Sequence, residues 1–257
     1  MLNNLIIGKN SFVGKSLKKY FNGIYISSKE IDDAKFGNFK NIILLSSPKI
    51  YKKRREKNFL FEKKILKKIT SQKLIFFSTS KIYPNKLNCS ESMCTDPQNF
   101  YAENKLKIEE LLLKEQKNTL ILRFSNIFDI DRINENTFLG LMHRNFFGKN
   151  RINFDISIKS LRDFVSMKSI KKVLKNIENN HLYGVYNVGS QNGYTIENII
   201  KFYFGLKAFK ATRINYNRIV KSQTLSTKKI RKLLRIKKNE FHLDTKNQLL
   251  KCRKFFF

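Results

Sequence analysis

A tyrosine and a lysine four residues apart, Tyr101 and Lys105, are the most informative pair of residues in the chain. At this spacing two residues lie one above the other on the same face of a helix. The lysine can then stabilise the phenolate, which lowers the pKa of the tyrosine from about 10 towards neutrality. Such a tyrosine can exchange a proton with a hydroxyl group of a substrate. The pair alone is weak evidence, because many helices contain one.

A glycine loop with a different chemical use follows the first apolar run, Leu5-Ile6-Ile7. Glycines at a strand-to-helix turn let the backbone bend tightly and approach a pyrophosphate, which binds at the N-terminus of the helix. Ser11 lies midway between the two glycines, and its hydroxyl either donates a hydrogen bond to the phosphates or weakens their binding. The predicted cofactor-binding residues of this loop are Gly8, Ser11, Phe12, Val13 and Gly14.

Apolar runs that alternate with helical patterns would position these motifs. After the glycine loop we expect a helix through Tyr20, and we expect a later helix over 101–113. Strands are predicted at 5–7, 24–27, 41–45, 74–77 and 119–123. This alternation predicts an α/β fold, a Rossmann-like doubly wound parallel sheet that binds its ligand at the carboxyl ends of the strands. The stretch between 27 and 41 is too short for a full helix and strand, so we expect an abbreviated sheet edge.

Two parts of unequal size are predicted. We expect residues 1–128 to form an NAD(P)-binding Rossmann domain to which 163–189 return. Residues 129–162 and 190–257 would then form a small C-terminal lobe that binds the substrate. The lobe is short, so we expect a reduced lid over the substrate.

Several segments, in a fixed order, resemble the extended short-chain dehydrogenase/reductase family, the NAD-dependent epimerases, dehydratases and ketoreductases that modify nucleotide sugars. The ordered recurrence of the segments carries the resemblance, which covers nearly the whole chain. The segments are Lys73–Pro84, Asp96-Pro97 followed by Tyr101-Ala102, Leu122–Asn126, Leu161–Val165 and Gly184–Gly189.

The resemblance implies a role for individual residues. Tyr101 corresponds to the acid/base of the family, and Lys105 to the residue that lowers its pKa and holds the nicotinamide ribose. Counting back from Ile82-Tyr83 places the catalytic Ser/Thr, which bonds the reacting sugar oxygen, on Thr79. Ser78 and Ser80 are alternatives within one residue of it. Asn126 and Arg162 match residues that contact the diphosphate of the substrate, although Arg162 and Asp163 could also form a structural ion pair.

Two departures from the family narrow the reaction. The 4,6-dehydratases of the family carry an Asp-Glu pair where this chain has Ser80-Lys81. GDP-fucose synthases share the Ile-Tyr-Pro ending but have a cysteine, needed for epimerisation, at the position of Lys81. The remaining expectation is reduction of a 4-keto nucleotide sugar or C4 epimerisation, by hydride transfer with Tyr101 as acid/base.

The end of the second predicted strand bears on the choice of cofactor. An acidic residue there would bind the 2′-hydroxyl of NAD, whereas serine and lysine can accommodate the 2′-phosphate of NADP. This chain has Ser28 and Lys29, which favours NADP(H), although Glu30 and Asp32 follow closely. The family also passes the next strand end, here Leu45 and Ser46, along the cofactor.

Composition sets wider limits. Lys and Arg number 52 against 20 Asp and Glu, a net charge of +32. One interpretation of this charge is a nucleic-acid or anionic-membrane partner. The other is a general over-use of lysine, with many of the lysines on a solvated helix face. No apolar run is long enough to span a bilayer. Three cysteines in no zinc-like spacing indicate a reduced, cytoplasmic protein, and the spacing of the three histidines, His143, His181 and His242, suggests neither a metal site nor a catalytic triad.

Two other classes of function remain open at this point. The serine in the glycine loop and the short lobe would suit a non-catalytic dinucleotide-binding sensor or partner subunit. The charge would suit a nucleic-acid or polyanion binder, whose association falls steeply with salt. A homodimer formed through the helix of Tyr101 is expected from the resemblance alone.

Overall fold

The computed structural model describes residues 2–45, 47–116, 118–132, 137–149, 151–178, 180–211 and 213–251. Contacts divide the chain into two compact units. The first consists of Met1–Pro84, Glu91–Phe124 and Lys171–Asn187, and the second of Asn85–Ser90, Ser125–Ile170 and Val188–Phe257. The second unit is larger than the predicted lobe. It includes 125–128 and 163–170 because Asn126–Phe128 pairs with Phe164–Ser166 in a small sheet of its own.

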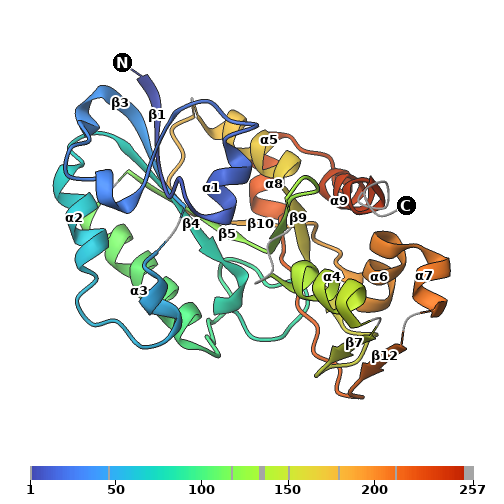
Figure 1. Cartoon of the computed structure of the whole chain (residues 1–257). Coiled ribbons are helices and arrows are strands. Elements are labelled where there is room, and N and C mark those ends of the chain that lie inside the picture. Colours follow the sequence, from blue (N-terminus) through green and yellow to red (C-terminus); the bar gives the residue numbers. More distant parts are fainter. Residues whose placement is uncertain are drawn as a thin grey trace. The chain divides into compact units, whose positions relative to one another are not determined.

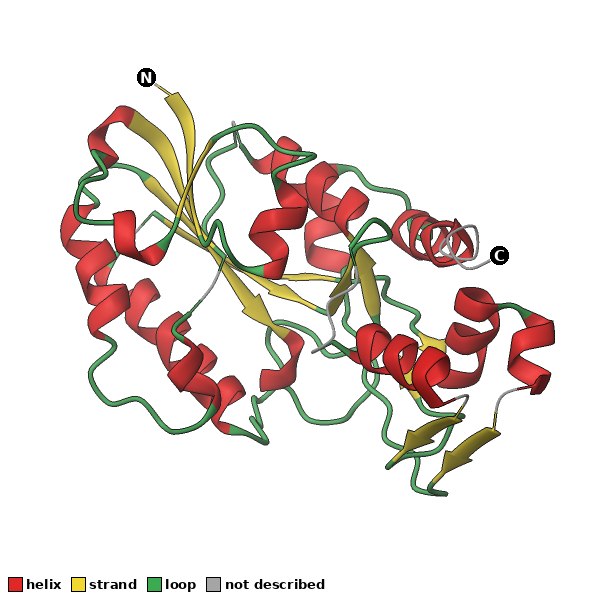
Figure 2. Ribbon diagram, viewed as in Figure 1, coloured by secondary structure: helices red, strands yellow, loops and turns green. Residues whose placement is uncertain are grey.

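A six-stranded sheet in the order β10-β5-β4-β3-β1-β2 organises the first unit (Figures 1 and 2). Strands β1 to β5 pair in parallel, as the alternating pattern predicted. The strands are β1 (Leu2–Ile7), β2 (Ile24–Ile26), β3 (Phe39–Leu44), β4 (Lys73–Thr79), β5 (Thr119–Phe124) and β10 (Gly184–Val188). The helices associated with them are α1 (Phe12–Leu17), α2 (Leu60–Lys68), α3 (Phe100–Glu115) and α5 (Met167–Ile177).

The abbreviated edge of the sheet is confirmed. Strand β2 has three residues and is the outermost strand, next to β1. Residues 27–38, all within the described part of the chain, hold two 3-10 turns, Ser28–Glu30 and Phe36–Asn38, and no α-helix. The chain then enters β3 directly on the other side of β1.

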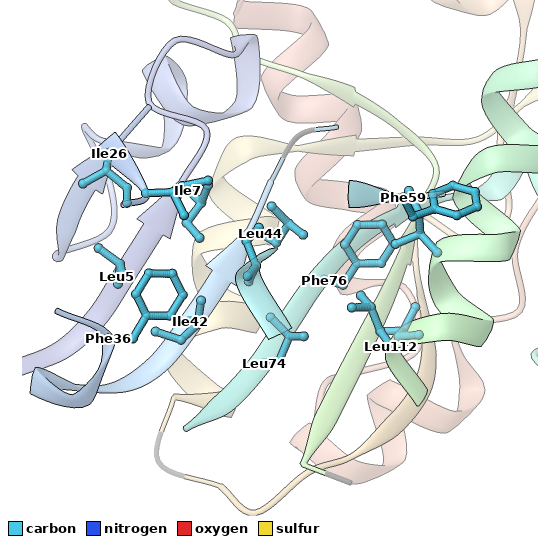
Figure 3. Packing of buried hydrophobic residues seen from close by; sticks show 14 of the residues in the cluster. Leu5, Ile7, Ile26, Phe36, Ile42, Leu44, Phe59, Leu74, Phe76 and Leu112 are labelled. Carbon is cyan, nitrogen blue, oxygen red and sulfur yellow. The ribbon is translucent and has the colours of Figure 1, made fainter. Parts of the chain in front are cut away.

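Alternate residues of the parallel strands build the core on the α2/α3 face of the sheet. Leu5 and Ile7 of β1, Ile42 and Leu44 of β3, and Leu74 and Phe76 of β4 point to this face (Figure 3). Successive side chains of a strand point to opposite faces, so every second residue belongs to one cluster. Ile65 of α2 and Ile108 and Leu112 of α3 close the cluster from the other side.

The second unit has its own core and several two-stranded sheets. Its cluster contains Phe128, Ile152, Phe164 and the buried face of α6, Ile196–Ile200. Its strands are β6 (Asn126–Phe128), β7 (Arg151–Phe154), β8 (Leu161–Arg162), β9 (Phe164–Ser166), β11 (Tyr194–Thr195) and β12 (Arg213–Tyr216). Its helices are α4 (Phe138–Lys149), α6 (Ile196–Phe204), α7 (Leu206–Ala211), α8 (Lys228–Leu234) and α9 (Glu240–Lys251).

Helix length and polarity bear on membrane insertion. Within the described ranges, no helix combines the length and the apolar character needed to cross a lipid bilayer.

Candidate functional site

Four of the predicted cofactor and catalytic positions lie at the carboxyl ends of neighbouring parallel strands. Gly8 follows β1, Ser28 comes two residues after β2, Leu45 follows β3, and Thr79 ends β4. Parallel strands bring their carboxyl ends to one edge of a sheet, which is the ligand-binding edge of doubly wound folds. Ser46, also predicted to contact the cofactor, lies outside the described residues.

The glycine loop uses each of its key residues for a separate structural purpose. Gly8 has a φ of 123°, which a side chain would disfavour. A Cβ atom at Gly14 would lie 2.2 Å from the carbonyl oxygen of Gly8, so only glycine lets α1 begin so close to the loop. The backbone geometry of this strand-to-helix turn therefore requires glycine at both positions.

Ser11 is the N-cap of α1. Its hydroxyl accepts a hydrogen bond of 2.9 Å from the N–H of Gly14 and donates one of 2.7 Å to the carbonyl oxygen of Gly8. Serine is a favoured N-cap because its oxygen satisfies a free helix N–H. The serine between the two glycines therefore stabilises the loop from within, with its hydroxyl proton directed to the carbonyl oxygen of Gly8.

A buried hydroxyl near this edge has no hydrogen-bond partner among the residues that the structure describes. The Oγ atom of Ser47, two residues beyond Leu45, is buried and has no hydrogen bond to any described residue. Buried polar atoms are nearly always hydrogen-bonded, so an unpaired one at a ligand-binding edge needs an explanation. Together with the loop of Gly8 and Gly14, this atom fits a polar cofactor such as a nicotinamide dinucleotide.

Tyr101 and Lys105 lie one turn apart near the start of α3, as predicted. Asn99 caps the helix by accepting a hydrogen bond of 3.0 Å from the N–H of Ala102. The ammonium of Lys105 lies 6.0 Å from the centroid of the Tyr101 ring and donates a hydrogen bond of 2.9 Å to the carbonyl oxygen of Phe77. The helix is thus tied to the strand that ends at Thr79.

The pKa of Tyr101 differs from the expected one. Burial raises the pKa of Tyr101 to about 12, instead of the decrease towards neutrality that the motif predicts. Burial likewise lowers the pKa of Lys105 to about 8, which the carboxylates of Glu62 and Glu109 partly oppose. At this separation desolvation outweighs the attraction between the phenolate and the ammonium. Tyr101 is consequently a protonated phenol at neutral pH in this structure.

The three adjacent hydroxyls at the end of β4 have different surroundings. Ser78 donates to the carboxylate of Glu109 on α3. Thr79 accepts a hydrogen bond of 3.2 Å from the N–H of Lys81 and caps the 3-10 turn Ser80–Ile82. Because Ser78 already serves a buried carboxylate, Thr79 and Ser80 are the better candidates for a contact with substrate.

Glu62 on α2 is a buried acid that the sequence analysis did not identify. Its exposure is 0%, and it accepts a hydrogen bond of 2.8 Å from the hydroxyl of Tyr51 through Oε2. Its other oxygen, Oε1, has no hydrogen-bond partner among the described residues. Burial raises the pKa of Glu62 to about 7, and the charge of Lys105 opposes this rise. Glu62 lies three residues after Phe59 and three before Ile65, which is helical spacing. This spacing puts Glu62 on the apolar face of the helix and could have predicted its burial.

A second network links α3, β5, β10 and Tyr83, which follows the 3-10 turn Ser80–Ile82. Arg123 donates to Glu109 at 2.6 Å through Nη2 and to the hydroxyl of Tyr83 at 2.7 Å through Nη1. That hydroxyl in turn donates to Asn187 at 3.0 Å. All four side chains are nearly fully buried. Segments that carry the family resemblance therefore meet in one internal network, which holds the first unit together.

The two predicted diphosphate contacts, Asn126 and Arg162, belong to the second unit. The amide of Asn126 donates a hydrogen bond of 2.8 Å to the carbonyl oxygen of Asp163. No hydrogen bond or ion pair joins the guanidinium of Arg162 to another described residue, and burial lowers the pKa of Arg162.

The carboxylate of Asp163 accepts instead from the N–H groups of Ser190, at 2.6 Å, and Leu225, at 3.0 Å. The alternative of an Arg162–Asp163 ion pair is therefore wrong.

The described residues hold no group of three or more His, Cys, Asp or Glu side chains that could bind a metal ion. His143, His181 and His242 were assigned no role, and burial lowers the pKa of His143 and His242.

The parallel sheet, the glycine loop and the Tyr-Lys helix define an α/β protein of the short-chain dehydrogenase/reductase type. The chain belongs to the RmlD substrate binding domain family, whose model matches residues 66–195. This match confirms the predicted resemblance. No curated protein sequence matches the chain.

Solved structures of the same fold cover almost all of the chain. RMD from Pseudomonas aeruginosa, complexed with NADPH, has a TM-score of 0.77 at 18% identity over 98% of each chain. MoeE5 in complex with UDP-glucose and NAD has a TM-score of 0.77 at 15% identity over 99% of each. UDP-N-acetylglucosamine 4-epimerase from Bacillus cereus has a TM-score of 0.73 at 16% identity, over 98% of this chain and 100% of that one.

Proposed function

We propose that this protein is an NADP(H)-dependent reductase of 4-keto nucleotide sugars. The observation that carries the proposal is the Lys105–Phe77 hydrogen bond, which joins the Tyr101–Lys105 helix to the strand ending at Thr79. The glycine loop, the unpaired Ser47 hydroxyl and the NAD(P)-bound solved structures of the same fold support a nicotinamide cofactor at the same edge.

When bound, a reduced nicotinamide supplies the hydride for the carbonyl carbon. The chain supplies the proton. Tyr101, protonated because burial raises its pKa to about 12, donates from its hydroxyl to the carbonyl oxygen. Thr79 bonds that oxygen, and the ammonium of Lys105 stabilises the phenolate that remains.

In a reductase Tyr101 donates its proton to the carbonyl oxygen, whereas in a C4 epimerase it must first accept a proton from the sugar hydroxyl. C4 epimerisation remains the second candidate, because one of the solved structures of this fold is a 4-epimerase.

The preference for NADP(H) rests on charges beside β2. The carboxylate of Glu30 caps the N–H of Ser27 at 2.8 Å and lies 3.5 Å from the ammonium of Lys9. Asp32 pairs with Lys64 at 2.6 Å. Each acid thus has a lysine beside it, which reduces the repulsion that it would exert on a 2′-phosphate near Ser28.

The guanidinium of Arg162 has no hydrogen bond or ion pair with another described residue and feels only the more distant charge of Asp155, which supports a role in binding the substrate diphosphate. A planar, permanently charged group suits two parallel hydrogen bonds to phosphate oxygens. The amide of Asn126, held by Asp163, would assist it.

Fluorescence titration with NADPH and NADH, alone and with a panel of nucleoside diphosphates, tests the proposal. We expect saturable binding of NADPH, tighter than NADH, together with binding of one nucleoside diphosphate. A coenzyme complex without any nucleotide partner would favour the sensor instead. Absence of coenzyme binding would eliminate both.

A further inference from the structure

A cavity of about 610 Å³ in the second unit is lined by five cations. They are Lys228, Arg231, Lys232, Arg235 and Lys238. None of the described residues that line the cavity is acidic, and none has been assigned to the reductase site. The five positive charges of the cavity wall therefore have no carboxylate among the described lining residues to balance them.

Helix α8 and its C-cap residue supply four of these cations (Figure 1). Lys228, Arg231, Lys232 and Arg235 recur at intervals of three, four and seven residues, which places them on one face of a helix. Ile230, 1% exposed, is buried on another face of the helix. Lys228, Lys232 and Arg235 are exposed and Arg231 is partly buried, so this basic face lines a solvent-accessible cavity and concentrates its charge there.

These charges are not neutralised inside the protein. No ion pair among the described residues involves any of the five, although Lys64, Lys168 and Lys201 elsewhere each pair with a carboxylate. Like charges gathered in one cavity repel one another, and a bound anion removes that cost.

Arg231 is held in place by a buried hydrogen-bond chain. Its Nε donates a bond of 3.1 Å to the hydroxyl of Thr227, which is fully buried. That hydroxyl donates a bond of 3.1 Å to the side-chain oxygen of Gln191, itself a residue of the cavity wall. This chain orients the guanidinium and leaves both Nη groups without a hydrogen-bond acceptor among the described residues. An oriented fork of this kind suits phosphate oxygens.

The backbone around the cavity is also unusual. Of the four non-glycine residues with a positive φ in the described part of the chain, three line it: Asn88, Gln191 and Arg235. Arg235 occupies a helix C-cap, where this conformation is common. Gln191, with a φ of 75°, lies in a bend between β10 and β11 and not at a helix C-cap, and strained residues of this kind concentrate at functional sites.

We propose that this cavity binds a compact anionic ligand that carries several phosphate groups. Its volume lies in the range of small-molecule sites, roughly 300–1,000 Å³. Ile236 is the one apolar residue among the described residues of its wall, which include no aromatic side chain on which a base could stack. The cavity would therefore recognise its ligand by the charge of the phosphate groups. This proposal does not depend on the proposed reductase activity.

Isothermal titration with inorganic tripolyphosphate, at about 150 mM salt to screen diffuse attraction, tests the assignment. We expect one site per chain and affinity higher than for inorganic phosphate. Arg231→Gln should weaken binding at least tenfold, because it removes an oriented, charge-assisted donor. Lys229→Gln makes the same charge change on the same helix outside the cavity wall and should change the affinity less than twofold. Thermal unfolding of both variants checks that they fold.

Several results would overturn the assignment. One is that tripolyphosphate shows no saturable binding. Another is that Arg231→Gln and Lys229→Gln weaken its binding equally, and a third is that Arg162→Gln abolishes its binding where Arg231→Gln does not. Duplex DNA or phosphatidylglycerol vesicles that bind more tightly than tripolyphosphate through Arg231 would show a macromolecular or membrane surface. The NADPH affinity of Arg231→Gln, expected to equal that of the unaltered protein, keeps a failure here separate from a failure of the reductase proposal.

Discussion

The ammonium of Lys105 donates a hydrogen bond of 2.9 Å to the carbonyl oxygen of Phe77, two residues before Thr79. Asn104, its neighbour on α3, donates to the carbonyl oxygens of Tyr51 and Arg54 at 2.9 and 2.8 Å. The start of α3 is thus fixed both to the end of β4 and to the segment before α2. The two hydroxyl groups proposed to contact the substrate oxygen, those of Tyr101 and Thr79, rest on one rigid framework.

Replacement of Tyr101 by phenylalanine should separate chemistry from binding. The variant lacks only the phenolic proton, so we expect turnover to fall at least about 100-fold while NADPH affinity stays within twofold. Steady-state kinetics and fluorescence titration measure the two effects. Tyr183→Phe, at an exposed position in the same unit, should change neither quantity. Loss of coenzyme binding by Tyr101→Phe would instead assign the residue a structural role.

Glu62 should control the pH at which Lys105 loses its proton. The carboxylate raises the pKa of Lys105 against the effect of burial, so its removal lowers that pKa below about 8. In Glu62→Gln, which still accepts from Tyr51, the basic limb of the pH–rate profile should shift to lower pH. Glu110→Gln, an exposed change on α3, should leave the profile in place. An unshifted limb in Glu62→Gln would mean that Glu62 does not act on Lys105.

The Glu62→Gln variant also tests how the stability of the fold depends on pH. The pKa of Glu62 is about 7 in the folded chain against 4.5 in the unfolded one, so between these values the folded state keeps a proton that the unfolded state has lost. Its contribution to stability is therefore complete at low pH and is lost as the pH rises to about 7. Relative to the unaltered protein, the free energy of unfolding of Glu62→Gln should therefore increase by about 3 kcal/mol when the pH is raised from about 4 to about 8. Denaturant unfolding of both proteins at the two pH values measures this change. If the two proteins differ by the same unfolding free energy at both pH values, the prediction is contradicted.

The positions of the motifs follow from the sequence because they depend on local rules. The apolar runs placed Gly8 and Leu45 at strand ends, the resemblance to the family placed Thr79 after the next strand, and parallel pairing brings these strand ends to one edge of the sheet. Ser11 could also have been predicted as an N-cap, since it directly precedes the helix. The sequence analysis considered instead only what the hydroxyl of Ser11 would do to the phosphates of a bound cofactor.

Properties that depend on tertiary distance could not be predicted in the same way. The Tyr101–Lys105 spacing says nothing about how deeply the pair is buried, and burial decides the sign of the pKa change of Tyr101. Arg162 and Asp163 are adjacent, but neighbouring residues in extended chain point in opposite directions. Asp163 consequently bonds Ser190 and Leu225, residues far along the chain.

The glycine loop offers a matched pair of substitutions. Gly14→Ala would place a Cβ atom 2.2 Å from the carbonyl oxygen of Gly8, and this backbone atom can move only if the loop moves. We expect lower stability and NADPH affinity reduced at least tenfold, a loss of roughly 1.4 kcal/mol or more. Gly37→Ala, where an added Cβ atom meets nothing within 4 Å, should retain full affinity. Equal behaviour of the two variants in a fluorescence titration would show that the loop does not bind the coenzyme.

The buried Arg123–Glu109 pair should be far more sensitive to charge removal than a surface pair. Arg123 is 6% and Glu109 1% exposed, and Glu109→Gln leaves the guanidinium charge uncompensated in the interior. Breaking one side of a buried pair costs about 3–5 kcal/mol, which corresponds to a Tm lower by roughly 6–20 °C in a chain of this size.

Glu103→Gln, on the same helix, removes the partner of Arg55, which is mostly exposed. Water solvates that guanidinium once the partner is gone, so we expect little change in Tm. Scanning calorimetry of the two variants at one pH provides the comparison. A Tm for Glu109→Gln close to that of Glu103→Gln would mean that the network of Arg123, Tyr83 and Asn187 does not hold the first unit together.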